Sequence, residues 1–375
     1  MRIEQINHYP LYPKGEYASS EKGENMNTLI ELIAEDGTKG YGSTYTTNAL
    51  TGAALRLIAP VLMKEEEIEP ARISERLHQS NFWLGRGGSV THVISGVDIA
   101  LWDLYGKLCG QSVSRLLGGR YRSEIRPYAS VTFHDADPVR GIEQKIEDAL
   151  ARGFAGIKFG WGTFGRINAK NDELLVSTCR KAAGDGVALM IDAGGSGTYY
   201  KGTYKQALET SKMLKDYDIE WYEEALRPDD IDGYVKLREH SPVKISNGEV
   251  LTRRQAFLPW IERGAMDIVQ PDCTKSGGIT EALRIAWYAY DHGIDWVGHG
   301  FNTAYGVAAD LHVAAALPVA SWVEYITPSP LIDKILVKPF AIGENGMLAI
   351  PDAPGLGIEP DMDAVRYYAI PPEAE

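Results

Sequence analysis

Eight short apolar runs are spaced through residues 126–325, and seven of them end at or near a polar residue. Stretches with the apolar spacing of amphipathic helices separate most of the runs, as at 204–217 and 279–293. Regular strand–helix units of this length favour a parallel (β/α) barrel over an open sheet, with functional groups at the carboxyl ends of the strands. The seven polar residues follow one another at intervals of 23 to 34 residues: Lys158, Asp192, Glu223, Glu249, Asp272, His299 and Glu324.

The first 120 residues have a different pattern. Residues 28–34 alternate between apolar and polar, Asp36-Gly37 supplies a turn, and residues 40–46 return, which predicts antiparallel strands within residues 1–50. Residues 51–120 have helical spacing and end at Gly118-Gly119. The Pro- and Gly-rich tail is expected to pack back on this N-terminal part.

Composition excludes several classes of protein. The net charge of -13 disfavours nucleic acid and anionic membranes as partners. No apolar run approaches 18 residues, the N-terminus has no signal-peptide pattern, and the three cysteines form no disulfide framework. We therefore expect a cytoplasmic enzyme.

Asp192, Glu223 and Glu249 end three successive runs, ALMID, IEWYE and VKISNGE. An apolar, β-branched run that ends in an acid is typical of a buried strand with a carboxylate at its tip. Three such tips can converge on one hard cation, and Mg²⁺ prefers carboxylate oxygens. The alternative for each acid alone is a solvated loop residue or a helix N-cap. Glu224 is expected to point away, as a supporting residue or ion-pair partner.

Asp272 and His299 end the next two runs. Because neighbouring strands lie about 5 Å apart, the carboxylate can reach one imidazole nitrogen, fix the tautomer and make the other nitrogen a general base. The alternative is a structural histidine.

Lys158 and Glu324 end two further runs. A lysine in a barrel strand needs a charge partner, so Lys158 could contact a substrate carboxylate, protonate a leaving group, or extend to the rim. Glu324 could hydrogen-bond a developing enolate if protonated, or only brace the rim. Two polar loops, residues 13–26 and the NFWLGRGG segment with Trp83 and Arg86, are candidate lids over such a site.

Several segments together resemble the enolase superfamily and, within it, the mandelate racemase-like subgroup. They are SGVDIALWDLYGKLCGQSVSRLLGG, MIDAG, WYEEAL, NGEVL, QPDCTKSGGITEAL and WVEY. The resemblance implies an α/β fold, a modified (β/α)₇β TIM-type barrel with an α+β capping domain. The corresponding division is a capping domain with lid loops at 1–124, a barrel catalytic domain at 125–330, and a segment at 331–375 that packs back on the capping domain.

The resemblance also implies chemistry. It makes Asp192, Glu223 and Glu249 the ligands of one Mg²⁺ per subunit, His299 the base that removes a proton α to a carboxylate, and Asp272 its orienting partner. It makes Glu324 a hydrogen-bond donor to the enediolate. An aspartate at 272, where the muconate cycloisomerase-like branch has lysine, disfavours that branch.

Two positions depart from the pattern of the family. Members with two-base chemistry carry Lys-x-Lys on the second barrel strand, but here Gly160 follows Lys158 and Phe159. Galactonate dehydratase-like members have a histidine that acts as an acid where this chain has Gly194. The loss of a second base disfavours a racemase.

We therefore expect a sugar acid dehydratase, a hydro-lyase of carbohydrate acid catabolism that removes the C2 proton and the C3 hydroxyl. Either His299 or Lys158 could be the acid that protonates the leaving group. The alternatives are a racemase or epimerase of a 2-hydroxy acid and a non-catalytic sugar-acid-binding protein. The partner is a small sugar acid, and a homo-oligomer is expected.

Overall fold

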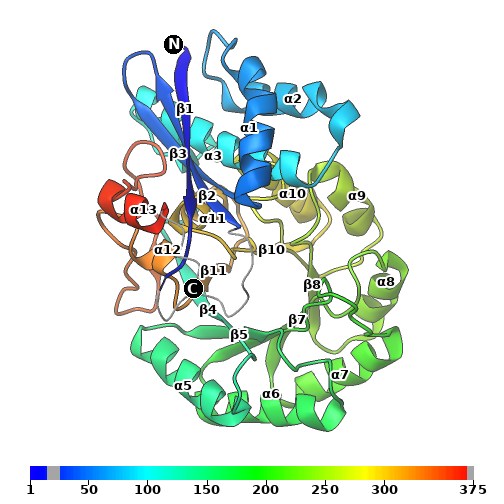
Figure 1. The fold of residues 1–375 in the computed structure, drawn as a ribbon. Helices are drawn as coiled ribbons and strands as arrows, with labels where there is room; N and C mark the ends of the chain where they lie inside the picture. Colours follow the sequence, from blue (N-terminus) through cyan, green and yellow to red (C-terminus); the bar gives the residue numbers. More distant parts are fainter. Residues whose placement is uncertain (15–25, 370–375) are drawn as a thin grey trace.

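All eight predicted barrel strands are present in the computed structural model, which describes residues 1–14 and 26–369 (Figure 1). They pair in parallel in chain order from the first to the seventh, and the eighth pairs with the first. The strands are β4 (Glu124–Thr132), β5 (Gly156–Gly160), β6 (Ala188–Asp192), β7 (Ile219–Glu223), β8 (Lys244–Asn247), β9 (Ile268–Val269), β10 (Asp295–Trp296) and β11 (Trp322–Ile326).

Seven of the strands are followed by a long helix on the outside of the curled sheet. These helices are α5 (Pro138–Ala151), α6 (Ala169–Ala183), α7 (Tyr204–Asp216), α8 (Ile231–His240), α9 (Arg254–Glu262), α10 (Gly278–Asp291) and α11 (Ala304–Ala315). After β11 comes only the four-residue α12 (Pro330–Asp333). The expected modified (β/α)₇β arrangement is therefore confirmed. The strand ladder described here is not continuous between β10 and β11, where the Gly300 N–H instead donates to the Glu324 side chain.

The strands are buried on both faces, which explains their nearly continuous apolar sequences. The interior is filled by one buried cluster whose members come from six different strands or their ends. The Tyr128 and Trp221 rings meet edge to face there, with centroids 5.5 Å apart. This aromatic plug fills the barrel below its carboxyl end, so a substrate has access only from above. The cluster comprises Tyr128, Met190, Trp221, Ile268, Val297 and Trp322.

The N-terminal part is an antiparallel sheet covered by helices (Figure 1). Its strands are β1 (Ile3–Leu11), β2 (Asn27–Ala34) and β3 (Lys39–Tyr45), and its helices are α1 (Asn48–Leu62), α2 (Pro70–Ser80), η2 (Phe82–Leu84), α3 (Ser89–Cys109) and α4 (Val113–Leu116). Helix α3 lies directly on β3 because both surfaces carry glycine: a Cβ on Gly42 would lie 2.1 Å from the Gly96 carbonyl oxygen. This close packing places the end of β3 against the barrel.

The segment after the barrel contacts both parts of the molecule. The strand β12 (Leu348–Ala349) pairs with β4, and the Leu356 N–H donates to Asp103 of α3 at 2.8 Å. Helix α13 (Met362–Ala369) lies beside β1, where the Tyr12 N–H donates to the Tyr368 carbonyl.

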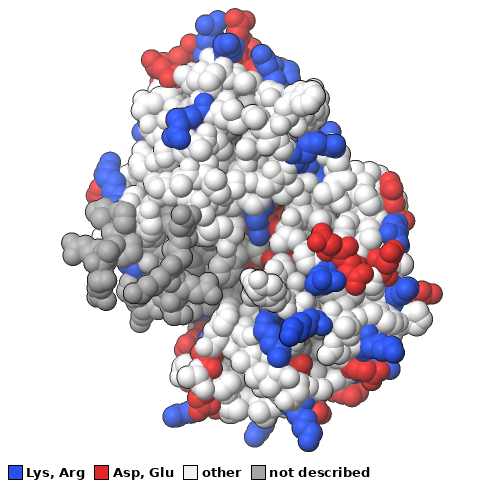
Figure 2. Space-filling view, turned by 45° about the vertical axis from the view of Figure 1, so that its right-hand side comes forward, with Lys and Arg blue, Asp and Glu red and all other residues white. Residues whose placement is uncertain are grey.

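Within residues 1–14 and 26–369, no helix has the length and apolar character needed to cross a membrane. Acidic and basic side chains are interspersed over the face shown in Figure 2.

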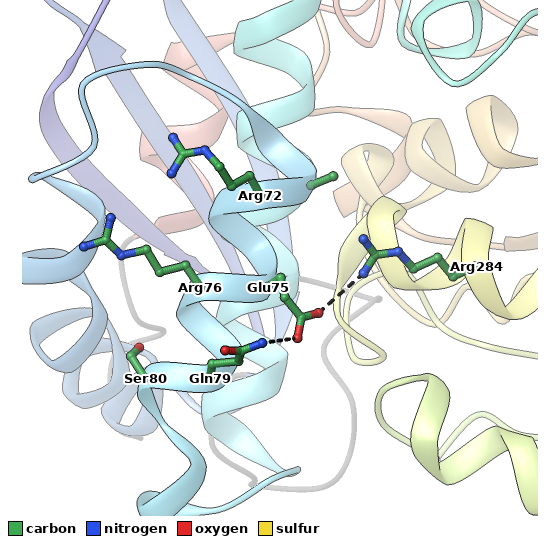
Figure 3. A pocket seen from close by; sticks show the side chains of 7 residues that line it. Arg72, Glu75, Arg76, Gln79, Ser80 and Arg284 are labelled. Atoms are coloured by element: carbon green, nitrogen blue, oxygen red, sulfur yellow. Dashed lines mark hydrogen bonds and ion pairs between the residues drawn. The ribbon is translucent and has the colours of Figure 1, made fainter.

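Glu75 of α2 connects the N-terminal part to three arginines of the barrel. Its carboxylate lies 3.2 Å from Arg254, 3.6 Å from Arg284 and 3.8 Å from Arg253, beside a groove of about 700 Å³ between α2 and α10 (Figure 3). Glu75→Ala removes the ion pair of Arg253 and leaves Arg254 and Arg284 to share Glu281. We expect the free energy of unfolding, measured in urea at low salt, to fall by about 1–2 kcal/mol.

Glu66→Ala is the matched control, because Glu66 forms an exposed pair with Arg2. Its effect should stay within about 0.5 kcal/mol. Equal losses in the two variants would show that the arginine cluster does not depend on Glu75.

His312 is a buried histidine that is fully hydrogen-bonded when neutral. Its Nδ1 accepts from the Ser114 N–H at 3.1 Å and its Nε2 donates to the Leu356 carbonyl at 3.0 Å. Burial lowers the pKa of His312 to about 4, against 6.5 ordinarily. The unfolded chain therefore binds the proton more tightly, so the stability contributed by His312 is complete above pH 6.5 and is lost as pH falls toward 4.

In urea unfolding, we expect the stability advantage of wild type over His312→Gln to shrink by at most about 3 kcal/mol between pH 7 and pH 4. His240→Gln, at an exposed position, is the control and should keep the wild-type pH slope. A pH-independent difference for His312→Gln would contradict the prediction.

Candidate active site

Asp192, Glu223 and Glu249 come together at the carboxyl ends of β6, β7 and β8. Asp192 lies directly beside Glu223 in the parallel register. One oxygen from each of the three carboxylates lies within 4.8 Å of the others, and all three residues are buried. Glu224 is directed elsewhere, since its Oε2 accepts from the backbone N–H and the hydroxyl of Ser196. Adjacent parallel strands thus deliver the three acids to one point.

The three carboxylates form an oxygen-only set suited to a hard divalent cation. Burial and the nearby Glu223 carboxylate raise the pKa of Asp192 well above its usual range. Three buried acids this close ionise together only if positive charge is placed among them. Carboxylate oxygens with room for water or substrate oxygens match the coordination preference of Mg²⁺, so the residues fit that ion.

Glu223 is held by three donors, one from its own strand, one from β5 and one from the end of β9. Its Oε1 accepts from Lys158 Nζ at 2.5 Å, and its Oε2 accepts from Trp221 Nε1 at 3.0 Å and from Gln270 Nε2 at 2.7 Å. Asp192 Oδ1 accepts from the Gly194 N–H at 2.6 Å. These bonds fix the carboxylates in orientation before any ligand arrives.

His299 and Asp272 form the predicted pair. His299 Nδ1 lies 2.7 Å from Asp272 Oδ2, and Asp272 Oδ1 accepts from the Thr274 N–H and hydroxyl, each at 2.6 Å. Burial opposes ionisation, but Lys275 and His299 outweigh it and hold the pKa of Asp272 below its usual range. A carboxylate at Nδ1 places the proton there and leaves Nε2 as the free base.

His299 Nε2 faces the three acids, 3.3 Å from Glu249 Oε2. Burial alone would lower the pKa of His299, but Glu249, Glu324 and the bond to Asp272 raise it above 6.5. A base beside the oxygen cluster is placed to remove a proton from a molecule held at that cluster.

Lys158 and Glu324 form a buried ion pair on the other side of the site. Lys158 Nζ lies 2.9 Å from Glu324 Oε1 and 2.5 Å from Glu223, above the Tyr128 ring. Glu324 Oε2 accepts from the Gly300 N–H at 2.7 Å. Burial is outweighed by Lys158 and His299, which lower the pKa of Glu324 to about 2. In this arrangement Glu324 accepts from two donors in its charged form, and Lys158 does not extend outward.

The two glycines that depart from the family pattern are close-packed. A Cβ on Gly160 would lie 2.7 Å from Asp192 Cβ. Gly194 has a φ of +58°, and the Trp161 indole lies over it, 2.7 Å from where a Cβ would be. Neither position accepts the lysine or histidine of other members without rearrangement. Trp161 itself has a φ of 61°.

The structure adds two residues that sequence reasoning had not assigned to the site. Tyr45, at the end of β3, reaches the barrel mouth, where its ring lies 5.0 Å from Lys275 Nζ and 6.5 Å from the Phe301 ring. Lys275 lies 3.5 Å from Asp272 Oδ2. The position of Lys275 three residues after Asp272 was a visible signal. Nothing local in the sequence indicates that Tyr45 meets residues more than 200 positions away.

The structure describes one of the two candidate lid loops in full and only the ends of the other. The loop with Trp83 and Arg86 packs on the segment after Glu249, since a Cβ on Gly87 would lie 2.7 Å from Thr252 Oγ1. Trp83 itself is 99% exposed. Most of the other candidate lid, 13–26, lies outside the described residues.

Comparison with known proteins gives the same family that the sequence motifs resemble. A family described as "Enolase C-terminal domain-like" matches residues 141–364, and "Mandelate racemase / muconate lactonizing enzyme, N-terminal domain" matches residues 15–118. D-galactarolactone cycloisomerase of Agrobacterium fabrum is 31% identical over 369 residues, which cover 95% of this chain and 94% of that protein. Arabinonate dehydratase of Saccharolobus solfataricus is 31% identical over 335 residues, which cover 87% and 86%.

A solved relative carries a metal. The crystal structure of a racemase from Streptomyces coelicolor A3(2) with bound magnesium superposes with a TM-score of 0.85 at 27% identity and covers 98% of this chain and 100% of that one. Fold, domain matches and relatives agree over nearly the whole length. The chain belongs to the enolase superfamily, within its mandelate racemase and muconate lactonizing enzyme family.

Proposed function

We propose that the protein is a Mg²⁺-dependent sugar acid dehydratase. Asp192, Glu223 and Glu249 would hold the ion, beside which the carboxylate of the substrate would bind. A bound Mg²⁺ supplies positive charge opposite the carboxylate oxygens, where negative charge collects in the transition state. His299 Nε2 removes the C2 proton, and Asp272 stabilises the resulting imidazolium. The C3 oxygen then leaves, and the enol tautomerises to a 2-keto-3-deoxy acid.

The observation that supports elimination is that His299 provides the one free base at the acid cluster among residues 1–14 and 26–369. His299 Nε2 faces the acid cluster. Gly160 stands where members with two-base chemistry have a second lysine, and Lys158 is paired with both Glu223 and Glu324. Racemisation requires a proton donor on the opposite face of C2 as well. Elimination requires only one base.

A second candidate is a cycloisomerase, which the relative acting on D-galactarolactone favours. Its first step would be the same removal of the C2 proton. The leaving oxygen would belong to a ring, so the product would have the mass of the substrate.

The test is a panel of aldonic, aldaric and lactone substrates with Mg²⁺ in deuterated water. We expect at least one member to give a 2-keto acid, and mass spectrometry then shows whether water was lost, as in a dehydratase, or retained, as in a cycloisomerase. Deuterium at C2 with inverted configuration and no 2-keto acid would establish a racemase instead. His299→Asn is the inactive control.

A further inference from the structure

Lys275 is a buried ammonium group whose Nζ makes no hydrogen bond within the described part of the chain. Its side chain is 9% exposed, and its ion pair with Asp272 Oδ2 is long, at 3.5 Å. Among residues 1–14 and 26–369, no oxygen accepts a hydrogen bond from Nζ. A lysine has three donors, and burying them without acceptors is costly unless a ligand supplies the acceptors.

Lys158, the other lysine of the site, is in the opposite situation. Its Nζ donates to Glu223 at 2.5 Å and lies 2.9 Å from Glu324. Two of its protons therefore serve the framework of the site. Of the two lysines, Lys275 is the one that can offer a proton.

Lys275 and His299 flank the same oxygen of Asp272. Oδ2 lies 2.7 Å from His299 Nδ1 and 3.5 Å from Lys275 Nζ. The Tyr45 ring lies 5.0 Å from Nζ and covers it from the N-terminal part of the chain. We infer that a substrate with its carboxylate at the acid cluster and C2 at His299 extends its next carbons toward that cover, past Lys275.

We propose that Lys275 is the catalytic acid that protonates the C3 oxygen as it leaves, on the same face of the substrate as His299. The inference rests on the proposed dehydratase function and supplies its unassigned residue. The C2–H electron pair forms the C2–C3 double bond, the C3–O bond breaks toward oxygen, and the Lys275 proton converts the departing hydroxyl to water. His299 keeps the C2 proton until Lys275 and His299 return to their starting states through solvent.

The test separates proton removal from departure of the oxygen. Lys275→Met is compared with wild type on the best panel substrate and on its 3-deoxy-3-fluoro analogue. Fluoride is the anion of a much stronger acid than water and leaves without a proton. We expect Lys275→Met to slow dehydration about 100- to 1,000-fold, to keep C2 deuterium exchange within about threefold of wild type, and to eliminate fluoride at nearly the wild-type rate.

Three variants complete the design. Lys275→Arg retains the charge but is a poor proton donor, so it should exchange C2 and still dehydrate slowly. Lys212→Met removes an exposed lysine that pairs with the exposed Glu209, and it should match wild type in every assay. His299→Asn should lose exchange and both eliminations.

The outcomes are distinct. Parallel losses of C2 exchange and fluoride elimination in Lys275→Met would overturn the proposal and assign Lys275 to positioning Asp272. Unchanged dehydration would overturn it as well. If wild type eliminates water from no sugar acid in the panel, the dehydratase proposal itself fails, whatever the variants do.

Discussion

Asp192→Asn is expected to stabilise the metal-free protein while removing its response to Mg²⁺. Asp192 is buried beside Glu223 and Glu249, with like charges within 4.8 Å. Asparagine keeps the oxygen that accepts from the Gly194 N–H and removes the charge. We expect the free energy of unfolding without metal to rise by about 1–3 kcal/mol, since the buried repulsion is relieved.

The same substitution should weaken Mg²⁺ binding at least about 100-fold and reduce activity about 1,000-fold or more, because the ion supplies several kcal/mol to the transition state. The measurement is thermal unfolding with and without Mg²⁺, together with calorimetric titration. Wild type should gain about 2.7 kcal/mol when Mg²⁺ is present at 100 times its dissociation constant. Asp192→Asn should gain about 0.4 kcal/mol or less at that concentration.

Asp185→Asn is the matched control, because Asp185 lies in an exposed loop before the same strand. It should keep both the metal response and the activity. A metal-free Asp192→Asn protein less stable than wild type would show that the three acids are not in electrostatic conflict. An unchanged Mg²⁺ response would mean that the ion binds elsewhere.

The strands and the acid-tipped ends could be predicted because they depend on local pattern. ALMID and IEWYE are apolar on both faces and end in acids, and the parallel register then places Asp192 beside Glu223 without further information. His299 and Asp272 follow from the same rule. The 2.7 Å bond between them is what adjacent strand ends allow.

Contacts between distant segments could not be predicted in this way. Tyr45 reaches Lys275 because α3 packs closely on β3, which depends on the pairing of Gly42 with Gly96 across the interface. The Trp161 indole over Gly194 depends on two residues with positive φ. These features arise from tertiary packing and leave no periodic signal in the sequence.

Glu324 shows a third kind of limit. Its position at the end of a strand could be predicted from the sequence, but its charge state depends on its partners in the fold. Lys158 comes from a strand two places away across the barrel closure, and the Gly300 N–H comes from the loop after β10. The sequence left the protonated and the bracing roles open, whereas these two donors favour the charged, bracing form.

His299→Asn is expected to abolish both C2 proton exchange and product formation, with a loss of about 10⁴-fold or more in kcat. The amide fits the space near Asp272 but provides no base at the position of Nε2, which lies 3.3 Å from Glu249 Oε2.

Asp272→Asn should lower kcat about 10³- to 10⁴-fold, because an amide that donates to Nδ1 moves the imidazole proton to Nε2. Both variants should bind Mg²⁺ with affinity close to that of wild type, since the three acids remain.

Exchange of the C2 proton into deuterated water, followed by NMR, measures the step that His299 performs. A His299→Asn protein that still exchanges this proton would mean that another group is the base, and Lys158 would be the first to replace. A variant that loses exchange together with Mg²⁺ binding would instead show that the substitution disturbs Glu249. Only loss of exchange with intact metal binding assigns the proton transfer to the imidazole, because the pair with Asp272 then acts on the substrate and not on the site that holds it.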